Sequence, residues 1–345
     1  MKALITGAAG FIGSQLAYKL WKTGISLVLV DNFSYGKPDN LIFPDHDFTP
    51  EIIRMDIRDK EGIASIFRDN DIDYAYNIAG IAPLPDCQAD PAEAISVNVS
   101  GFVNICEAAR KYGVRTIIQA STNAIYENET RFPVTEAGFS VLPTLIYPNT
   151  KYCAERFAQS FCDTYGMNIV CLRFSNVYGP HIDCLRTQPP FVAYMIRELY
   201  YNRTPVFHSD GNQRRDYVYV DDLTDLAWAV RECRGFDCVN ASSGVNYSVN
   251  EMFSIAYRLV RKTAYGGGGL TYADDRHYWE KYPALYEGRY RIKDEILHHE
   301  INKYSLCDNT HAREKYGWSP RVSMEEGLAA VIEYTCSLLS GMEQR

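Results

Sequence analysis

The chain has 345 residues, and 46% of them are hydrophobic, which is enough for a large buried core. Its formal net charge of −8 argues against a nucleic-acid-binding protein. No run approaches the roughly 18 apolar residues that a membrane span needs, and Met1–Gly13 is typical of a strand and loop rather than a signal peptide. Ten scattered cysteines without a C-x-x-C pair indicate reduced thiols, so we expect a cytoplasmic protein and no metal site.

Short apolar segments alternate with amphipathic ones through the first half of the chain. Phe11–Thr23 has helical spacing and ends at Gly24, and the run Leu27–Val30 fits a strand buried on both faces. This alternation predicts an α/β fold, a Rossmann-like doubly wound parallel sheet. The strands are expected at Lys2–Thr6, Ser26–Asp31, Asp73–Ala79, Arg115–Ala120 and Asn168–Phe174.

Beyond Phe174 the pattern becomes irregular and rich in proline, which predicts a smaller α/β part over the carboxyl ends of the strands. We therefore expect a dinucleotide-binding domain over residues 1–175 and a mainly substrate-binding part over 176–345. Four consecutive glycines open the aromatic and charged segment Tyr265–Tyr290. We expect a long loop there, which is either a lid, a partner contact or without function.

The glycines of the first βα turn have the spacing of a dinucleotide-binding loop. Gly7, Gly10 and Gly13 follow a predicted strand and open a predicted helix, where small residues let the backbone approach a pyrophosphate. The N–H groups of Phe11 and Ile12 and the positive end of the helix dipole would then face the anion. An ordinary βα turn is the alternative.

Asp31 ends the second predicted strand, 18 residues beyond Gly13. A carboxylate there accepts both ribose hydroxyls and repels a 2′-phosphate, and no arginine lies within residues 31–39, so we expect NAD rather than NADP. Asp56-Ile57 is expected near the adenine. The small residues Ala79-Gly80 leave room for the cofactor at the end of the expected strand Asp73–Ala79.

Tyr147-x-x-x-Lys151 is a candidate acid/base pair, although Tyr18 and Lys22 have the same spacing and are interpreted as a surface pair. Pro148 suits a first helical turn, which places both side chains of the candidate pair on one helix face. Thr122, at the end of a predicted strand, supplies a hydroxyl. For a tyrosine to act as a base near neutrality its pKa must fall by roughly three units, about 4 kcal/mol, which a nearby ammonium and a positive nicotinamide ring can supply.

With both sites in place, the chain resembles the extended short-chain dehydrogenase/reductase superfamily, and specifically its NAD-dependent sugar-nucleotide epimerase/dehydratase family. The resemblance covers nearly the whole chain. In the family, the Asn176 position contacts the sugar nucleotide and the Arg215 position binds its diphosphate, a task suited to a guanidinium. The markers are the glycine loop, Asp31, Asn98, Tyr147-x-x-x-Lys151, Arg173–Pro180, Arg215–Asp222 and Tyr316-Gly317-Trp318-x-Pro320.

The residues and the resemblance together define the predicted site. The catalytic group is Thr122, Tyr147 and Lys151, and the substrate contacts are Thr122, Asn123, Asn176 and Arg215. The cofactor NAD is expected to contact Gly7, Gly10, Phe11, Ile12, Gly13, Asp31, Asn32, Asp56, Ile57, Ala79, Gly80, Asn98, Ala120, Tyr147, Lys151, Phe174 and Val177.

Two departures from the family bear on the reaction. Family 4,6-dehydratases follow the threonine with an Asp-Glu pair, and UDP-glucuronate decarboxylases keep the Glu, whereas Asn123 and Ala124 stand here. Many relatives also carry an arginine near position 298 as a phosphate clamp. This chain has His298-His299, and Arg289 or Arg291 is the expected substitute.

The resemblance therefore implies a nucleotide-sugar epimerase that acts through a transient 4-keto sugar. A 4-keto-sugar reductase is the main alternative, and a dehydratase or decarboxylase is less favoured. A non-catalytic NAD-binding regulator is the alternative from a different functional class.

The family commonly forms homodimers through two helices, expected here at Val97–Tyr112 and Tyr147–Tyr165. One apolar stripe of each helix must pack on its own sheet. Each helix carries further apolar residues, which favour a second contact between subunits, and wider burial within the monomer is the alternative. The apolar residues of the two helices are Val99, Val103, Ile105, Cys106, Tyr152, Phe157 and Phe161. The expected partners are a nucleotide-sugar substrate and a second copy of the chain, with no nucleic acid and no membrane.

Overall fold

The centre of the molecule is a seven-stranded parallel sheet in the order β10-β6-β5-β4-β1-β2-β3. The computed structural model describes residues 1–43, 45, 47–186, 189–263, 265–266, 270–274 and 279–344. Strands β2 and β4 flank β1, so the strand order reverses there, which confirms the predicted doubly wound class. The strands are β1 Lys2–Thr6, β2 Ser26–Asp31, β3 Ile52–Arg54, β4 Tyr74–Asn77, β5 Thr116–Thr122, β6 Ile169–Phe174 and β10 Phe236–Ala241.

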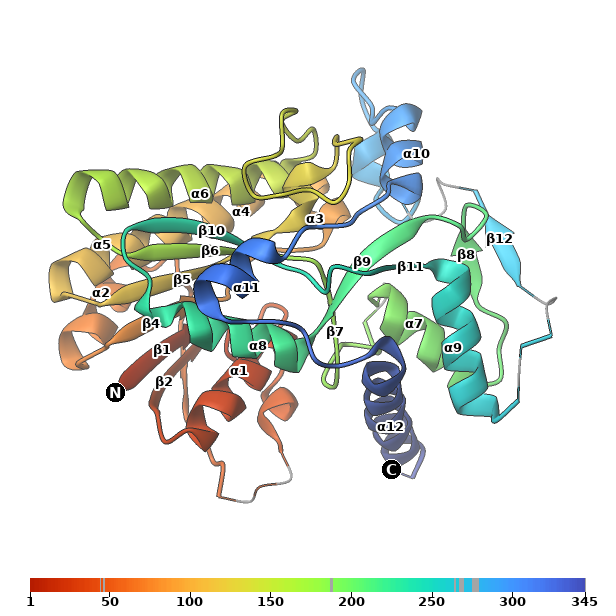
Figure 1. Cartoon of the computed structure of the whole chain (residues 1–345), viewed down its shortest axis with the longest axis horizontal. Coiled ribbons are helices and arrows are strands. Elements are labelled where there is room, and N and C mark those ends of the chain that lie inside the picture. The colour runs from red at the N-terminus through yellow and green to blue at the C-terminus, as the bar shows by residue number, and fades with distance from the viewer. Residues whose placement is uncertain are drawn as a thin grey trace.

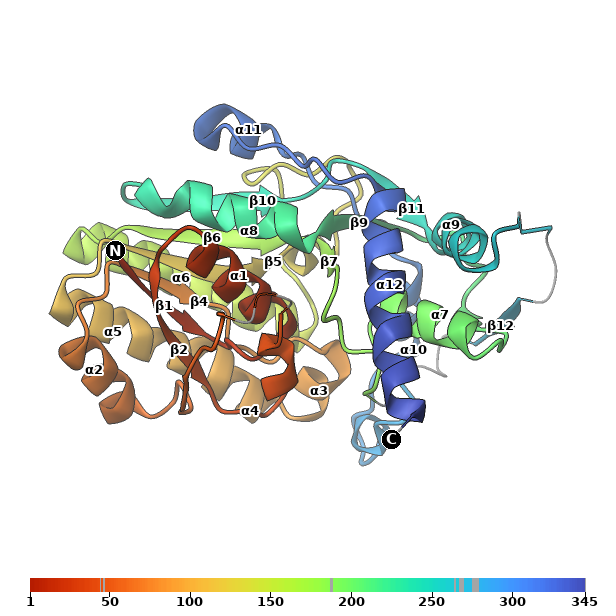
Figure 2. The same cartoon turned by 90° about the horizontal axis from the view of Figure 1, so that it is seen from below.

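Helices cover both faces of this sheet (Figures 1 and 2). One face packs against α1 (Phe11–Lys22), α8 (Val220–Ala229) and α11 (Thr310–Tyr316). The opposite face packs against α2 (Lys60–Asp69), α5 (Phe102–Tyr112) and α6 (Ile146–Tyr165). Both faces are buried, which accounts for the continuous apolar runs of the strands.

The helix covering the second face is interrupted where the sequence suggested one continuous segment. Short helices α3 (Leu84–Ala89) and α4 (Pro91–Ile95) come first, and Ser96–Gly101 forms a π-helical turn before α5 begins. Left-handed glycines then end α5 and α6, at Gly113 with φ 74° and Gly166 with φ 68°.

The rest of the chain builds a second lobe beyond the carboxyl ends of the strands (Figure 1). A three-stranded sheet in the order β11-β9-β7 joins it to the first lobe, and β8 pairs with β12. Helices α7, α9 and α12 enclose its core around Met195, Phe253 and Leu328. The strands are β7 Asn176–Tyr178, β8 Val206–His208, β9 Arg214–Tyr219, β11 Asn246–Ser248 and β12 Thr271–Ala273. The helices are α7 Phe191–Tyr200, α9 Val249–Arg261, α10 Asp294–Asn302 and α12 Met324–Glu343, with 3₁₀ turns at Pro38–Leu41, Asn123–Tyr126, Val230–Glu232 and Pro283–Tyr286.

The two lobes are interleaved along the chain. Strand β10 and helices α8 and α11 come from the second half of the sequence but pack with the first-lobe sheet. In the segment 265–290, residues 267–269 and 275–278 lie outside the described part. The described remainder is mostly loop, as expected, and also contains the short strand β12 and the 3₁₀ turn Pro283–Tyr286, which the sequence analysis did not predict.

Among the described helices, none combines the length and apolar character needed to cross a membrane.

A buried ion pair ties α6 to the sheet next to the candidate site. Arg173 on β6 donates from Nε and Nη2 to the two carboxylate oxygens of Glu155, at 3.0 and 2.7 Å, and both side chains are 4% exposed or less. Arg173 also donates to Tyr126, while Ser121 donates to Glu155. Since every member is satisfied, the network fixes α6 against β5 and β6.

We predict that Glu155→Ala lowers the free energy of unfolding by about 3–5 kcal/mol, because it leaves the Arg173 guanidinium buried without a counter-ion. Urea denaturation followed by circular dichroism measures this. The control is Glu325→Ala, which breaks the Arg258–Glu325 pair, whose side chains are 52% and 54% exposed, and should cost about 1 kcal/mol or less. Equal losses in the two variants would contradict the assigned role of the buried pair.

Candidate active site

A cavity of about 410 Å³ lies where the carboxyl ends of the central strands meet the second lobe. It brings together the predicted catalytic residues Thr122, Tyr147 and Lys151 with residues of both lobes. Twelve of the predicted site residues line it: Phe11, Ile12, Gly80, Ala120, Thr122, Asn123, Tyr147, Lys151, Phe174, Asn176, Val177 and Arg215.

The glycine loop after β1 is packed too tightly for side chains. A Cβ on Gly7, whose φ is 68°, would lie 2.7 Å from the Ala79 nitrogen, and one on Gly13 would overlap the Gly7 carbonyl oxygen. Helix α1 begins at Gly10 with no side-chain cap and no acidic residue in its first turn. Its first N–H groups therefore suit an anion such as a pyrophosphate, and the loop fits a dinucleotide.

Asp31 lies at the end of β2 beside this loop and is 7% exposed. One of its carboxylate oxygens accepts from the Ala9 nitrogen at 2.9 Å and the other from the Phe33 nitrogen at 2.7 Å. The side chain thus links the glycine loop to the following turn, and the remaining lone pairs can serve a ribose.

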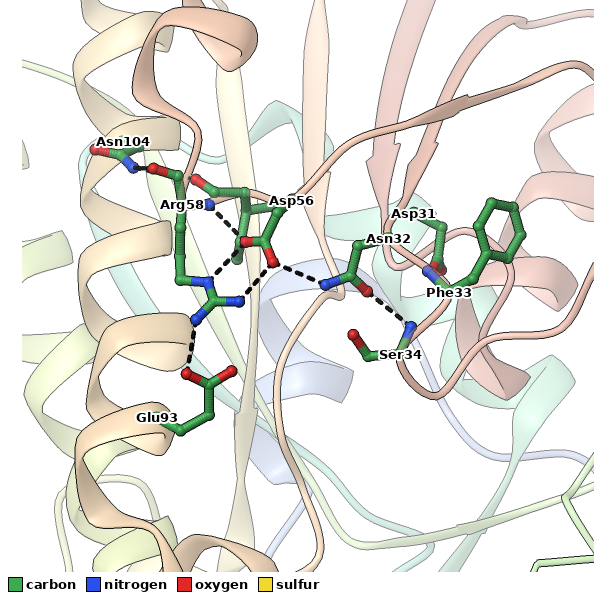
Figure 3. Close-up of polar contacts among 9 residues, drawn as sticks. Asp31, Asn32, Phe33, Ser34, Asp56, Arg58, Glu93 and Asn104 are labelled. Carbon is green, nitrogen blue, oxygen red and sulfur yellow. Dashed lines mark hydrogen bonds and ion pairs between the residues drawn. The ribbon is translucent and has the colours of Figure 1, made fainter.

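Asp56, predicted near the adenine, belongs to a second carboxylate cluster beside β2 (Figure 3). It accepts from Asn32 Nδ2 at 2.8 Å and from Nε and Nη2 of Arg58 at 2.9 and 2.8 Å. These Arg58 hydrogen bonds lower the pKa of Asp56 to about 2. Arg58 also reaches Glu93 at the start of α4, while the Ile57 side chain packs into the core under α5 rather than toward a ligand.

Asn98 fixes the backbone of Ile81, a role that the sequence analysis, which predicted a cofactor contact, did not anticipate. Its Oδ1 accepts from the Ile81 nitrogen at 2.8 Å, and its Nδ2 donates to the Ile81 carbonyl and to Thr150 Oγ1, each at 3.0 Å. A Cβ on Gly80 would lie 2.9 Å from both Asn98 Oδ1 and Lys151 Nζ. The Gly80–Ile81 segment is therefore fixed directly against Lys151.

Tyr147 and Lys151 lie one helical turn apart on α6. Lys151 is buried and Tyr147 is partly buried, and the setting disfavours charge on both. Lys151 Nζ donates to the Ala120 carbonyl at 3.1 Å, and burial lowers its pKa to about 8. Burial raises the pKa of Tyr147 to about 12, and a hydrogen bond with Thr122 only partly offsets this. The fall in the tyrosine pKa expected from the sequence is thus absent in the protein alone, so the positive nicotinamide ring would have to contribute it.

The other Tyr-x-x-x-Lys pair lies outside the cavity. Tyr18 on α1 donates its hydroxyl to Asp45, and the Lys22 ammonium lies 4.8 Å from the centre of the Tyr18 ring. The interpretation of this pair as a structural feature of the surface agrees with that placement.

The end of the cavity nearest the second lobe is formed around the last turn of α10. Arg215 on β9 donates from Nη2 to the carbonyls of Glu300 and Ile301 at 2.8 and 3.0 Å, and burial lowers its pKa. Asn176 donates to the Asp216 carbonyl at 2.9 Å. The buried Nδ2 of Asn123 has no hydrogen-bond partner within the described residues, which leaves a donor for a ligand.

Two cations of this end were missed by sequence reasoning. Lys303, bound to Glu300 at 2.6 Å, and Arg186 both line the cavity. Neither Arg289, whose guanidinium lies 5.6 Å from the Tyr290 ring, nor Arg291, which donates to the Gly288 carbonyl, is a lining residue in the described structure. The described structure therefore does not place Arg289 or Arg291 at the cavity, and their role as substitutes for the late arginine stays a prediction. Lys303 immediately follows α10, and no local pattern marks it.

Comparisons with known proteins identify the family of the chain. Residues 3–237 match the NAD dependent epimerase/dehydratase family. A UDP-glucose 4-epimerase of Mycolicibacterium smegmatis is 30% identical over 338 residues, covering 97% of this chain and 98% of that protein. UDP-glucuronic acid decarboxylase 1 of Arabidopsis thaliana and a mouse dTDP-D-glucose 4,6-dehydratase also match, at 25% and 26% identity, each over 96% of this chain.

Solved structures give the same result. The UDP-glucose 4-epimerase of Thermotoga maritima, determined with UDP-glucose, superposes with a TM-score of 0.84 at 30% identity, covering 98% of this chain and 100% of that one. The UDP-glucose 4-epimerase of Thermus thermophilus in complex with NAD has a TM-score of 0.79 at 25% identity, covering 97% and 99%.

The fold, the glycine loop and the Tyr147-x-x-x-Lys151 pair define an extended short-chain dehydrogenase/reductase, as expected from the sequence. The chain belongs to the NAD-dependent epimerase/dehydratase family, whose cofactor is NAD.

We predict that Lys151→Met stabilises the fold at pH 7. A lysine whose folded pKa is about 8, against 10.5 when unfolded, destabilises the native state while it is charged, by up to about 3 kcal/mol. The penalty disappears as the pH rises from 8 through 10.5, so the advantage of the variant should shrink over that range. Urea denaturation at pH 7 and pH 10 tests this, with the exposed Lys60→Met as control; no gain at pH 7 would contradict it.

Proposed function

We propose that the protein is an NAD-dependent nucleotide-sugar epimerase that inverts C4 through a transient 4-keto sugar. The observation that carries the proposal is the meeting of Thr122, Tyr147 and Lys151 in one cavity with the cations Arg215 and Lys303. The named activities of the most similar relatives support it.

The proposed cofactor site follows the order of the strands. The glycine loop and the start of α1 hold the pyrophosphate, Asp31 binds the adenosine ribose, and Asn32 with Asp56 borders the adenine. Phe11, Ile12, Gly80, Ala120, Phe174 and Val177 line the cavity toward the nicotinamide. Asn98 supports this wall through Ile81.

In the proposed mechanism Tyr147, as phenolate, takes the proton from the 4-hydroxyl and later returns it to the same oxygen. Thr122 hydrogen-bonds that oxygen. Lys151 holds the nicotinamide ribose and its charge favours the phenolate. NAD, if bound beside these residues, would supply the reversible hydride chemistry at C4 that inversion through a 4-keto sugar requires. The remaining task of the protein is to hold the diphosphate while the sugar turns over.

The proposed diphosphate contacts are Arg215 and Lys303, with Asn176 and Asn123 toward the sugar. A guanidinium and an ammonium at one end of a largely buried cavity supply the charge that a diphosphate requires. We assign residues 176–345 mainly to substrate binding, excepting β10, α8 and α11, which complete the first lobe.

The residues after Thr122 disfavour the other family reactions. Dehydration and decarboxylation use acidic side chains that Asn123 and Ala124 lack, because an amide cannot exchange a proton at neutral pH and alanine carries no polar group. A 4-keto-sugar reductase would use the same three residues but consume reduced cofactor. A non-catalytic regulator would have no need for the complete Thr122, Tyr147 and Lys151 set.

Product analysis tests the proposal. The purified protein is incubated with a panel of UDP-, GDP-, CDP- and dTDP-sugars, and product stereochemistry is followed by NMR. We expect a C4 epimer to accumulate to equilibrium without net consumption of cofactor. A 4-keto-6-deoxy product, a pentose product or stoichiometric oxidation of reduced cofactor would instead identify a dehydratase, a decarboxylase or a reductase.

We predict that Tyr147→Phe reduces kcat by at least about 10²-fold, because it removes only the oxygen that exchanges the proton. The fold and the NAD content, measured by circular dichroism and by absorbance after acid release, should stay unchanged. The control is Tyr18→Phe, which alters the other Tyr-x-x-x-Lys pair outside the cavity and should keep the wild-type rate. A Tyr147→Phe enzyme of normal rate would refute the acid/base assignment.

We further propose a cytoplasmic homodimer formed by α5 and α6. Ile105, Cys106 and Phe161 are buried within the monomer, so packing inside one subunit explains these three residues without a dimer contact. Phe157, in contrast, is 42% exposed on the outer face of α6. The free cysteines suit a reducing compartment.

Light scattering at micromolar concentration should therefore give twice the mass of the chain, and Phe157→Asp should give the monomer because it places a charge in the contact. Val245→Asp, at a valine that is 51% exposed in the second lobe, is the control and should leave the dimer intact. A monomeric wild-type protein would rule out the dimer without affecting the catalytic assignment.

A further inference from the structure

A row of buried polar side chains crosses the sheet beneath the candidate site. Thr6 on β1, Asn77 on β4 and Gln119 on β5 are neighbours in register, and each is 1% exposed. Positions on this sheet face are otherwise occupied by apolar residues such as Leu4, Ala75 and Ile117. Burying an amide without a hydrogen bond costs about 1–3 kcal/mol, so these side chains need partners.

The three side chains form a continuous hydrogen-bonded chain. Thr6 Oγ1 donates to Asn77 Oδ1 at 2.5 Å, and Asn77 Nδ2 donates to Gln119 Oε1 at 2.7 Å. Gln119 Nε2 then donates to the Ala120 carbonyl at 3.0 Å. The same carbonyl oxygen accepts from Lys151 Nζ at 3.1 Å.

The Ala120 carbonyl oxygen, the last acceptor, sets the direction of all the hydrogen bonds in this row. A carbonyl oxygen can only accept, so Gln119 must turn its Nε2 toward Ala120 and its Oε1 toward Asn77. Asn77 must then present Nδ2 to Gln119 and Oδ1 to Thr6, which has to donate. Each amide therefore has one orientation. Gln119 and the Lys151 ammonium share one carbonyl oxygen, which accepts from both, and they compete in the sense that each donor draws on the electron density that the oxygen offers to the other.

Glu155 lies one helical turn beyond Lys151 on α6, and its charge is paired with that of Arg173. Cys87 of α3 and Cys171 of β6 are the titratable neighbours from other elements, and burial raises both thiol pKa values far above neutrality. Tyr147 lies on the same helix, and Gly80 and Asn98 close the remaining side. The Ala120 carbonyl is thus the acceptor on which the ammonium depends.

We propose that Gln119 is a positioning residue that sets how strongly the Ala120 carbonyl holds the Lys151 ammonium, with Asn77 and Thr6 fixing its orientation. The catalytic consequence rests on the proposed function, in which the charge of Lys151 favours the Tyr147 phenolate. The hydrogen-bond competition itself does not depend on that function.

The test is Gln119→Met, which keeps the length of the side chain and removes the donor. With the oxygen left to the ammonium alone, the charged form of Lys151 gains stability, and its titration midpoint should rise by about half a pH unit or more. NMR of the protein labelled with ε-¹³C-lysine measures this midpoint, and Lys151→Met assigns the signal. The alkaline limb of the kcat/KM profile should move in the same direction.

Thr116→Val is the matched control, because Thr116 is a buried polar residue at the start of the same strand, 2% exposed. It should leave the Lys151 midpoint in place. Gln119→Leu serves if the methionine variant does not fold. In wild-type protein, moreover, the side-chain amide signal of Gln119 should shift with the same midpoint as Lys151.

An unchanged or lowered Lys151 midpoint in the Gln119 variants, or a Gln119 amide signal that does not follow Lys151, would overturn the proposal. The NMR midpoint stands apart from turnover. A protein without epimerase activity but with the expected shift would therefore refute the proposed function and leave the Gln119 assignment intact.

Discussion

A parallel sheet brings the carboxyl ends of its strands to one edge, and the whole candidate site depends on this constraint. The glycine loop follows β1, Asp31 ends β2, and Thr122 ends β5, although these residues are far apart in sequence. Because β1 lies between β2 and β4, the loops that follow these two strands diverge to either side of the glycine loop. A long ligand can therefore extend from the Asp31 side to the Thr122 side across a single edge.

Catalysis and stability make opposite demands on α6. The helix is held to the sheet by the Arg173–Glu155 pair, and Tyr147 and Lys151 of the same helix line the cavity. Burial there disfavours a phenolate and an ammonium, as the directions of both pKa shifts show. Functional sites commonly destabilise a fold in this way. In the proposed mechanism, a cationic nicotinamide ring beside the pair would favour the Tyr147 phenolate.

The local sequence pattern was sufficient to predict the elements that have strong hydrophobic periodicity or a characteristic glycine spacing. The bounds of β1 and β2 agree with expectation, and α6 begins one residue before Tyr147. The π-helical turn at Ser96–Gly101 lay inside an unbroken helical pattern. Lys303 and β10 could not be placed, because their positions follow from packing between segments distant in sequence. Gln119 was missed for a related reason: a single amide within an apolar strand gives no signal until its neighbours across the sheet are known.

The hydrogen bonds of Arg215 with the last carbonyls of α10 have a consequence for binding entropy. A free arginine loses rotamer freedom of up to about 2 kcal/mol when a ligand fixes it. In this protein that loss has already occurred on folding, because Nη2 is held by Glu300 and Ile301. An anion that arrives at the exposed edge of the guanidinium meets an oriented donor. Affinity at this end of the cavity should thus arise from preorganisation more than from the number of contacts.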